Sequence, residues 1–343
     1  MKQSTLKRYF KFGINHLFGS MLGGLGSVLM YHRIENGKKQ NIKYRDPELF
    51  SPTRGLFVAL DQFEEQIKLI STNFIPIPLD MIEQRALEKK QKSKFIALTF
   101  DDGYLDNFDL AVPVLEKYGV YATIFVTTGF ISGAAKPWWF ALEELIQESS
   151  TIDLIWKQES YSYSLDSIDK RYLCWDQLWQ LFKESSLTDR KELSKRLRLD
   201  KFESGLDKIF PSMERLKQYK RHPLISLQPH TVSHPVLSQE SNHSARAEII
   251  ASKQALESIL YGNSSSFAYP YGDSNSVSPR DFELVKELGF KRAFTTESQN
   301  IKRNSFEKPF SLPRINIDYF DSISSFEQKL SGVESFVRQL TKT

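Results

Sequence analysis

Ile96-Ala97-Leu98-Thr99-Phe100-Asp101-Asp102-Gly103-Tyr104 is the stretch that decides the fold. An apolar run with strand character ends in two adjacent carboxylates and a glycine, which lets the chain turn sharply because it has no Cβ. Neighbouring side chains of a strand point to opposite faces, so the two acids need not share a task. The pattern predicts a buried strand that delivers Asp101 and Asp102 to the edge of a sheet. The competing interpretation is a strand end with two solvated turn aspartates.

The composition of the chain excludes some classes of function. The chain of 343 residues carries 46 Lys and Arg against 42 Asp and Glu, and the resulting net charge of +4 is too small to indicate a nucleic-acid partner. A single cysteine, Cys174, excludes an intramolecular disulfide framework and a cysteine zinc cluster. Hydrophobic residues make up 40% of the chain, which is enough for a substantial core.

The amino terminus contains no acidic residue before Glu35. Its apolar residues recur at helical spacing opposite lysine and arginine, which predicts a basic amphipathic helix over residues 1–26. Residues 1–22 would contact a membrane surface peripherally, or the helix would pack on the domain; a cleaved signal peptide is a third interpretation. No stretch approaches the roughly 20 apolar residues of a spanning helix. We expect a protein that is cytoplasmic or peripheral to the inner membrane, with export left open.

Strands and helices alternate along most of the chain, which indicates parallel strands with helices outside. Most strands look buried on both faces, so we predict an α/β fold, an irregular (β/α)7-type barrel, rather than an open sheet. The barrel would comprise residues 27–135 and 222–325, a mostly helical insertion residues 136–221, and a C-terminal helix residues 326–343. The expected strands are residues 27–31, 74–79, 95–100, 120–126, 224–227, 267–269, 290–295 and 312–317.

Two tryptophans, Trp138 and Trp139, open the insertion. Exposed aromatic rings stack on sugars, but tryptophans that anchor an insertion to its host domain explain the pair equally well.

A second motif, His230-Thr231-Val232-Ser233-His234-Pro235, directly follows a predicted strand. The i, i+4 spacing would put both imidazoles on one face of a helical turn, although such a pair in a loop often arises by chance. Two histidines and one carboxylate form a facial ligand set with open positions for water and substrate. Because active groups collect at the carboxyl ends of barrel strands, His230 and His234 can converge with the Asp101-Asp102 pair.

Three segments resemble the first three motifs of the polysaccharide deacetylase family, also called the NodB homology domain. They are, in chain order, Thr99-Phe100-Asp101-Asp102-Gly103, His230-Thr231-Val232-Ser233-His234-Pro235 and Phe267-Ala268-Tyr269-Pro270-Tyr271-Gly272. The resemblance covers roughly residues 27–135 and 222–320. It implies an irregular barrel of about seven strands and metal-dependent hydrolysis of N-acetyl groups on amino sugars.

The resemblance also implies residue roles. Asp102, His230 and His234 would bind a divalent metal ion, with Zn expected first and Co, Ni, Mn or Fe as alternatives. Asp101 would be the general base, and the backbone N–H of Tyr271 would stabilise the oxyanion. Four residues in or beside the motifs are candidates for substrate contact: Tyr104, Tyr269, Pro270 and Trp138.

The chain departs from the family pattern at two positions. Many members carry an arginine in the third motif that orients the base, where this chain has Ala268; Arg314 could replace it, or form a surface salt bridge. The late Leu-x-His motif that supplies the general acid is absent, since no histidine follows His243. His32, after the first predicted strand, is the substitute, with a structural histidine as the alternative.

We therefore expect a deacetylase that acts on an N-acetylated glycan or glycolipid, either a bacterial cell-surface polysaccharide or its lipid-linked precursor. A deformylase of a lipid-linked amino sugar is an alternative within the same chemistry. A catalytically idle glycan-binding member of the fold is another. A glycosidase fits poorly, because adjacent acids cannot flank one bond at the required separation of about 5–10 Å.

Overall fold

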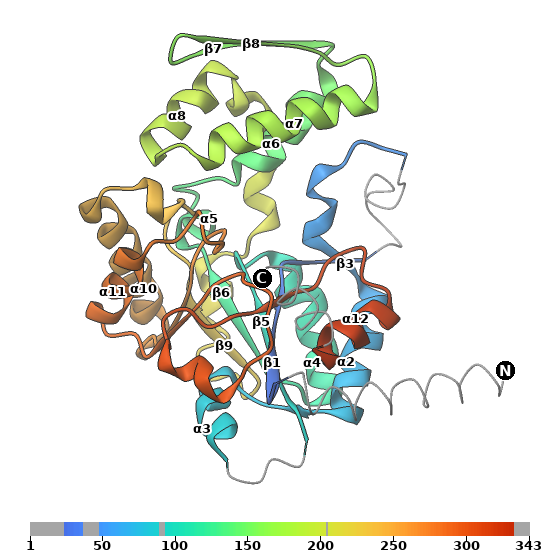
Figure 1. Cartoon of the computed structure of the whole chain (residues 1–343), viewed down its shortest axis with the longest axis vertical. Helices are drawn as coiled ribbons and strands as arrows, with labels where there is room; N and C mark the ends of the chain where they lie inside the picture. Colours follow the sequence, from blue (N-terminus) through green and yellow to red (C-terminus); the bar gives the residue numbers. More distant parts are fainter. Residues whose placement is uncertain (1–23, 37–47, 89–92, 204, 333–343) are drawn as a thin grey trace, which may run out of the picture.

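A computed structural model describes residues 24–36, 48–88, 93–203 and 205–332 of the chain (Figure 1). Most of the amphipathic helix predicted over residues 1–26, up to residue 23, and the end of the predicted C-terminal helix lie outside these residues. Among the residues described, no helix is both long and apolar enough to cross a membrane.

Parallel strands build the centre of the molecule. Five of them follow the order β12-β1-β5-β6-β9 in one sheet, and the short strand β4 (Ile75–Pro76) pairs with the first residues of β5. The strands of this path are β1 (Gly26–Tyr31), β5 (Phe95–Phe100), β6 (Ala122–Val126), β9 (Ile225–Pro229) and β12 (Ile315–Asn316).

Two further parallel strands, β10 (Ser266–Ala268) and β11 (Arg292–Phe294), close the sheet into a barrel. A parallel bridge joins Phe294 to Leu312, and the chain continues from there into β12. Between β9 and β10 a side chain takes the place of the backbone ladder: Gln228 Oε1 accepts the backbone N–H groups of Ser265 and Ser266, each at 2.9 Å. The described residues thus form an irregular barrel of seven main strands, which confirms the predicted fold class.

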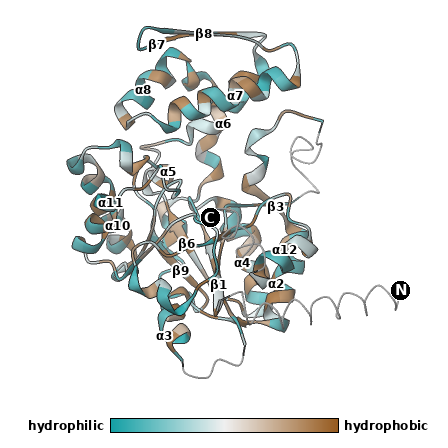
Figure 2. Cartoon of the chain, viewed as in Figure 1, coloured by the Kyte–Doolittle hydropathy of each residue, from teal (hydrophilic) through white to brown (hydrophobic). Residues whose placement is uncertain are grey.

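The two-residue period of the strands separates two apolar layers. Val28, Ala97, Phe125 and Phe294 belong to one buried cluster that fills the barrel. The alternate residues of β1, β5 and β6 belong to a second cluster, which packs against the surrounding helices, and Ala293 of β11 belongs to a third. In Figure 2 the central strands carry mainly hydrophobic colours, whereas the helices around them mix polar and hydrophobic ones. Alternation along β5 therefore carries on past Phe100 and points Asp101 into the barrel mouth.

Helices cover the outside of the barrel and make up most of the insertion. Those around the barrel are α2 (Leu60–Asn73), α3 (Ile82–Leu87), α4 (Val112–Tyr118), α5 (Thr128–Ser132), α10 (Asn242–Leu260), α11 (Pro279–Glu287) and α12 (Ile323–Ser331). Those of the insertion are α6 (Trp138–Glu148), α7 (Ile168–Lys183), α8 (Leu187–Arg196) and α9 (Met213–Lys217).

An antiparallel hairpin in the insertion differs from the expected helices. Strand β7 (Thr151–Trp156) pairs with β8 (Glu159–Ser164), and the residues of β7 alternate between exposed and buried. Both turn residues, Lys157 (φ 48°) and Gln158 (φ 71°), adopt left-handed backbone. Hairpin turns of this kind favour glycine, asparagine or aspartate, so Lys-Gln gave no turn signal.

A second pair of strands lies outside the strands expected from the sequence. Strand β2 (Arg33–Glu35) pairs in parallel with β3 (Phe57–Ala59). Each has three residues, too few to show a hydrophobic period.

The insertion lies on the side of the barrel where the strands end (Figure 1). Several polar contacts hold it there. Among them are Lys183 Nζ to Asp273 Oδ2 at 2.5 Å, the Leu187 N–H to Glu240 Oε1 at 2.6 Å, and an arginine of α8 to the second histidine motif.

Candidate active site at the carboxyl ends of the strands

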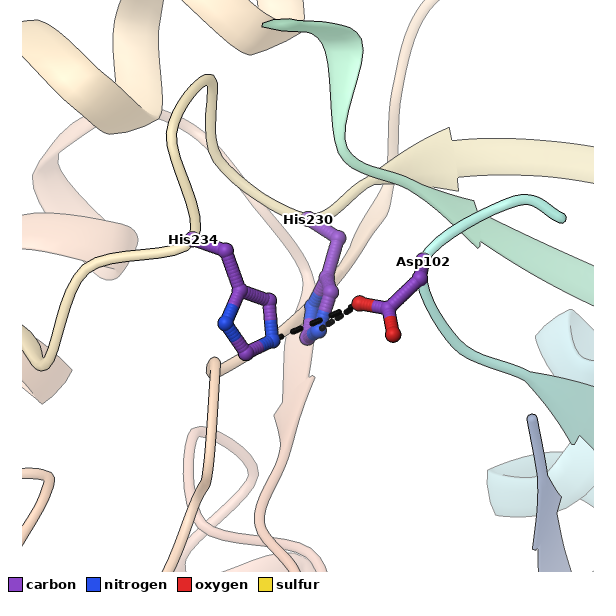
Figure 3. Close-up of side chains that lie close together, drawn as sticks. All are labelled: Asp102, His230 and His234. Atoms are coloured by element: carbon purple, nitrogen blue, oxygen red, sulfur yellow. Dashed lines mark ion pairs between the residues drawn. The ribbon is translucent and has the colours of Figure 1, made fainter. Parts of the chain in front are cut away.

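Three predicted ligands converge at the mouth of the barrel. Asp102 follows β5, and His230 and His234 follow β9; Figure 3 shows the three side chains pointing toward one another. The distance from Asp102 Oδ1 is 3.3 Å to His234 Nε2 and 3.7 Å to His230 Nε2. The three candidate ligand atoms lie within 4.8 Å of one another, and all three residues are buried.

The histidines do not share a helical turn, contrary to the prediction from their spacing. Residues 230–234 form a loop in which Thr231 (φ 67°) and His234 (φ 53°) have left-handed backbone. Glu248 of α10 holds this loop by accepting the N–H groups of Val232 at 2.9 Å and Ser233 at 2.8 Å. Sequence reasoning missed Glu248, because one glutamate in a helix carries no signal of such a role.

A close backbone approach fixes the same loop from the other side. The Gly129 N–H donates to the Val232 carbonyl at 2.9 Å, and the Thr128 N–H donates to the Thr231 carbonyl at 3.1 Å. A Cβ at position 129 would collide with the Val232 carbonyl, so only glycine allows this contact.

The environment of the three side chains fits a divalent cation. His230 Nδ1 donates to the Ala268 carbonyl at 2.7 Å, which leaves the lone pair of Nε2 facing Asp102. Burial lowers the pKa of His230 to about 4 and that of His234 well below its usual value, so both imidazoles are neutral. Asp102 Oδ1 is buried and accepts no hydrogen bond from any described residue. A buried carboxylate oxygen beside two neutral imidazoles is the donor set that Zn and similar ions prefer.

Without a cation the same carboxylate is poorly stabilised. Burial and the neighbouring charge of Asp101 raise the pKa of Asp102 to about 8. A positive ion next to Asp102 would reverse this effect, because it favours the ionised form.

Asp101 lies in a different environment from its neighbour. Arg314, which is fully buried, grips it with two parallel bonds: Nη1 to Oδ1 at 2.6 Å and Nη2 to Oδ2 at 2.7 Å. Burial alone would raise the pKa of Asp101, but the charge of Arg314, together with His230, outweighs it and holds the pKa below its usual value. Asp101 is therefore an ionised carboxylate, with its Oδ2 4.0 Å from His230 Nε2.

The structure decides between the two interpretations of Arg314. Its Nε donates to the Thr295 carbonyl at 3.1 Å, and its Nη1 also donates to Thr99 Oγ1 at 3.1 Å. It is a buried partner of Asp101 and not part of a surface salt bridge. Arg314 thus reaches from the segment before β12 to the acid that follows β5.

His32 lies in the same mouth. The backbone N–H of Asp101 donates to the Tyr31 carbonyl at 2.9 Å, which sets the end of β1 beside the end of β5. Tyr31 stacks on Phe100 with ring centres 5.4 Å apart on the outer face, so the next residues, His32 and Asp101, turn inward. Burial lowers the pKa of His32, while the charge of Asp101 opposes this effect.

Tyr271 borders the ligands from the third motif. Its ring centre lies 4.8 Å from that of His234, and its backbone is left-handed (φ 59°). Thr296 holds the turn by donating from Oγ1 to the Tyr271 carbonyl at 2.6 Å. Burial raises the pKa of the Tyr271 hydroxyl, and the positive charge of Arg190 opposes this shift.

The four predicted substrate contacts have different surroundings. Tyr269 is fully buried and donates its hydroxyl to the Phe310 carbonyl at 3.0 Å, and Pro270 is buried too; both belong to the core, so a direct substrate contact is wrong for them. Tyr104 is also fully buried, stacked on Phe210 with ring centres 5.0 Å apart, and cannot offer a ring face to a sugar. These three side chains are part of the packed core beneath the site.

Trp138 and Trp139 both anchor the insertion. Trp138 stacks on Phe182 of α7 with ring centres 4.4 Å apart, and only 8% of it is exposed. The Trp139 ring lies 5.2 Å from that of His234. The anchoring interpretation therefore holds for both rings.

Comparisons with known proteins agree with this geometry. A family model described as polysaccharide deacetylase matches residues 88–293, which is more than half of the chain. The chain belongs to the polysaccharide deacetylase family. YxkH of Bacillus subtilis, a polysaccharide deacetylase by name, is 35% identical over 101 residues, 29% of this chain and 30% of that protein. A poly-beta-1,6-N-acetyl-D-glucosamine N-deacetylase of Staphylococcus aureus is 26% identical over 179 residues, 49% of this chain and 57% of that protein.

Both alignments span less than two thirds of the relative's own length. Solved structures share the fold over most of the chain. The Streptococcus pyogenes deacetylase PplD, solved with acetate, superposes with a TM-score of 0.58 at 20% identity, over 89% of this chain and 97% of that one. IcaB from Ammonifex degensii superposes with a TM-score of 0.55 at 17% identity, over 91% and 99%.

Proposed function

We propose that the protein is a metal-dependent deacetylase that removes N-acetyl groups from amino sugars of a bacterial cell-surface polysaccharide or of its lipid-linked precursor. One observation carries the proposal: the buried cluster of Asp102, His230 and His234 lies next to an ionised Asp101 that Arg314 holds in place. Family membership supports the same chemistry.

Asp102, His230 and His234 would hold the cation, with Zn expected first and Co, Ni, Mn or Fe as alternatives. A cation bound there would polarise the acetyl carbonyl and lower the pKa of a nearby water molecule. Asp101 takes the proton of the attacking water, and Arg314 keeps the carboxylate ionised and oriented for that transfer. The Tyr271 N–H stabilises the negative charge that develops on the carbonyl oxygen.

The C–N bond of the acetamide then breaks, and acetate leaves. The amine of the sugar needs a proton at this step, and His32, which follows β1 next to the end of β5, supplies it. Its low pKa in the unliganded protein means that His32 must receive the proton during the reaction, through contact with Asp101 or the attacking water.

Acetate release tests the proposal. Metal-loaded protein should release acetate from N-acetylglucosamine oligomers of β-1,6 or β-1,4 linkage or from N-acetylated glycolipids, and a chelator should stop it. His230→Ala and His234→Ala should each lose both bound metal and turnover. Metal retained at full occupancy in either variant would contradict the ligand assignment.

The same assay separates the alternatives. Formate instead of acetate, from an N-formylated glycolipid, would identify a deformylase. Full metal content without hydrolysis of any glycan would indicate an idle glycan-binding member of the family.

For location, we propose a protein that is cytoplasmic or peripheral to the inner membrane, supported by the basic, acid-free amino terminus. Removal of residues 1–22 should reduce binding to anionic lipid vesicles without abolishing acetate release from a soluble oligomer. Unchanged vesicle binding would contradict membrane contact through this segment.

A further inference from the structure

A cavity of about 540 Å³ lies between the insertion and the barrel. Its walls come from the segment that follows α5, from α8 and the turn after it, and from Ser233 of the second histidine motif. Because Ser233 precedes the candidate ligand His234, the cavity adjoins the metal centre.

Positive charge predominates around this cavity. Its lining includes Lys136, Arg190, Lys191 and Lys195 but only two acids, Asp200 and Glu203. Lys136 and Glu203 neutralise each other in an ion pair of 3.0 Å. Lys191 and Lys195 lie one turn apart on α8 and are exposed, and neither has a carboxylate within ion-pair distance among the described residues.

Arg190 is the unusual member of the group. It is only 5% exposed, yet among the residues described it pairs with no carboxylate. Its Nε donates to the Phe182 carbonyl at 2.8 Å and its Nη1 to the His234 carbonyl at 3.0 Å. Its Nη2 is buried and makes no hydrogen bond to a described residue. A buried cation without a counter-charge is costly, so an anion in the cavity would stabilise it.

Trp138 adds an uncharged donor to the same wall. Its side chain lines the cavity, and its buried indole Nε1 lies near the Tyr271 hydroxyl without a hydrogen bond of ordinary geometry to a described residue. Indole N–H groups seldom stay unbonded when buried, and an oxygen atom of a ligand would satisfy this one.

We propose that this cavity is an anion subsite that binds a phosphate or carboxylate group of the glycan, next to the N-acetylated sugar over the metal centre. Arg190 and Trp138 form its wall, and Lys191 and Lys195 form its rim. The inference rests on the proposed deacetylase function and narrows its substrate to glycans or glycolipids that carry negative charge close to the acetylated residue.

Binding measurements test the subsite apart from catalysis. Calorimetry on metal-loaded protein carrying Asp101→Asn, which slows turnover, would compare three ligands: a neutral N-acetylglucosamine oligomer, the same oligomer ending in a phosphate, and the same oligomer ending in a uronic acid. The charged oligomers should bind about tenfold more tightly than the neutral one, and this advantage should shrink at high salt. The charged oligomer that binds more tightly identifies the natural anion.

Two double variants in the same background complete the experiment. Lys191→Ala with Lys195→Ala should reduce the advantage of the charged ligands to about twofold or less. Lys157→Ala with Lys170→Ala, which removes equal charge from ion pairs elsewhere on the insertion, should preserve it.

Equal affinity for neutral and charged oligomers in the Lys157 and Lys170 control would overturn the subsite, and so would an advantage that survives the loss of Lys191 and Lys195. Acetate release is a separate assay, so failure of the anion subsite is distinguishable from failure of the deacetylase proposal.

Discussion

At the scale of residues, the two adjacent aspartates differ because the strand period and one left-handed residue separate them. Asp101 continues the inward face of β5 and meets Arg314, whereas Asp102 (φ 71°) turns the chain toward the histidines. His234 and Tyr271 also have left-handed backbone. Non-glycine residues in this region cost about 1–3 kcal/mol each, and they cluster at functional sites because the surrounding contacts enforce them. The left-handed backbone at these positions therefore orients the candidate ligand side chains toward one another.

Replacement of the proposed base tests its role directly. Asp101→Asn should keep the metal, because the ligands are unchanged, and should lower kcat by about 10²–10⁴-fold, because an amide cannot take the proton. Metal analysis and acetate release on the same sample provide the two measurements. The isosteric change preserves packing around Arg314. A variant with near-normal turnover would contradict the base assignment.

Loss of the arginine should change the pH dependence. Arg314 holds the pKa of Asp101 below its usual value, so Arg314→Leu should move the acid limb of the kcat/KM profile to higher pH. Stability should change as well. The ionised pair contributes above the unfolded pKa of Asp101, about 3.9, and this contribution disappears as pH falls through the lower folded pKa. Near neutral pH the variant should lose about 3–5 kcal/mol of the free energy of unfolding.

The control for this change is Arg314→Lys, which keeps the charge but not the two parallel bonds. It should give a smaller shift of the acid limb and a smaller loss in denaturant unfolding. Identical pH profiles in all three proteins would show that Arg314 does not act on the base.

At the scale of elements, neighbouring strands of the barrel are not all joined by the same pattern of hydrogen bonds. Most neighbouring strands share a regular parallel ladder, but β9 and β10 meet through the Gln228 side chain. The Ser265 and Ser266 N–H groups would otherwise lack acceptors at this seam. One side-chain oxygen thus replaces the backbone hydrogen bonds that would join these two strands. His230 follows Gln228 by two residues.

The contact between Gln228 and the strand β10 should contribute to the stability of the fold. Gln228→Leu should lower the free energy of unfolding by about 2–4 kcal/mol, because two backbone N–H groups lose a common acceptor in a mostly buried place. Gln228→Glu retains an acceptor oxygen and should lose much less. Urea unfolding of both variants measures the difference, and equal losses would contradict the role of the acceptor.

At the scale of the whole molecule, the insertion is part of the active site. Helix α8 reaches the candidate metal ligands through Arg190, whose Nη1 donates to the carbonyl of His234, and α6 brings Trp139 against the His234 ring. The insertion therefore supports a candidate ligand that belongs to the barrel.

This coupling can be measured. Arg190→Gln should weaken metal affinity by about 10–100-fold, because the support of a ligand is lost. Competition with a chromogenic chelator reports the affinity without any need for turnover. Arg196→Gln, an exposed change on the same helix, should leave the affinity unchanged. Equal metal affinities in all three proteins would show that the insertion does not support the site.

The sequence by itself determined the parts of this protein that depend on local pattern. The alternation of strands and helices predicts the barrel. The residue types after two strands identify Asp102, His230 and His234, and the family resemblance points to His32 and Arg314. Local pattern could not reveal the Gln228 seam, Glu248 or Arg190, because each of these depends on a partner distant in the chain. It missed the hairpin β7–β8 because the turn residues Lys157 and Gln158 are not typical of a hairpin turn. Tertiary packing alone decided that Tyr104, Tyr269 and Pro270 lie in the core, since a motif shows which residues are near in sequence but not which side of them faces solvent.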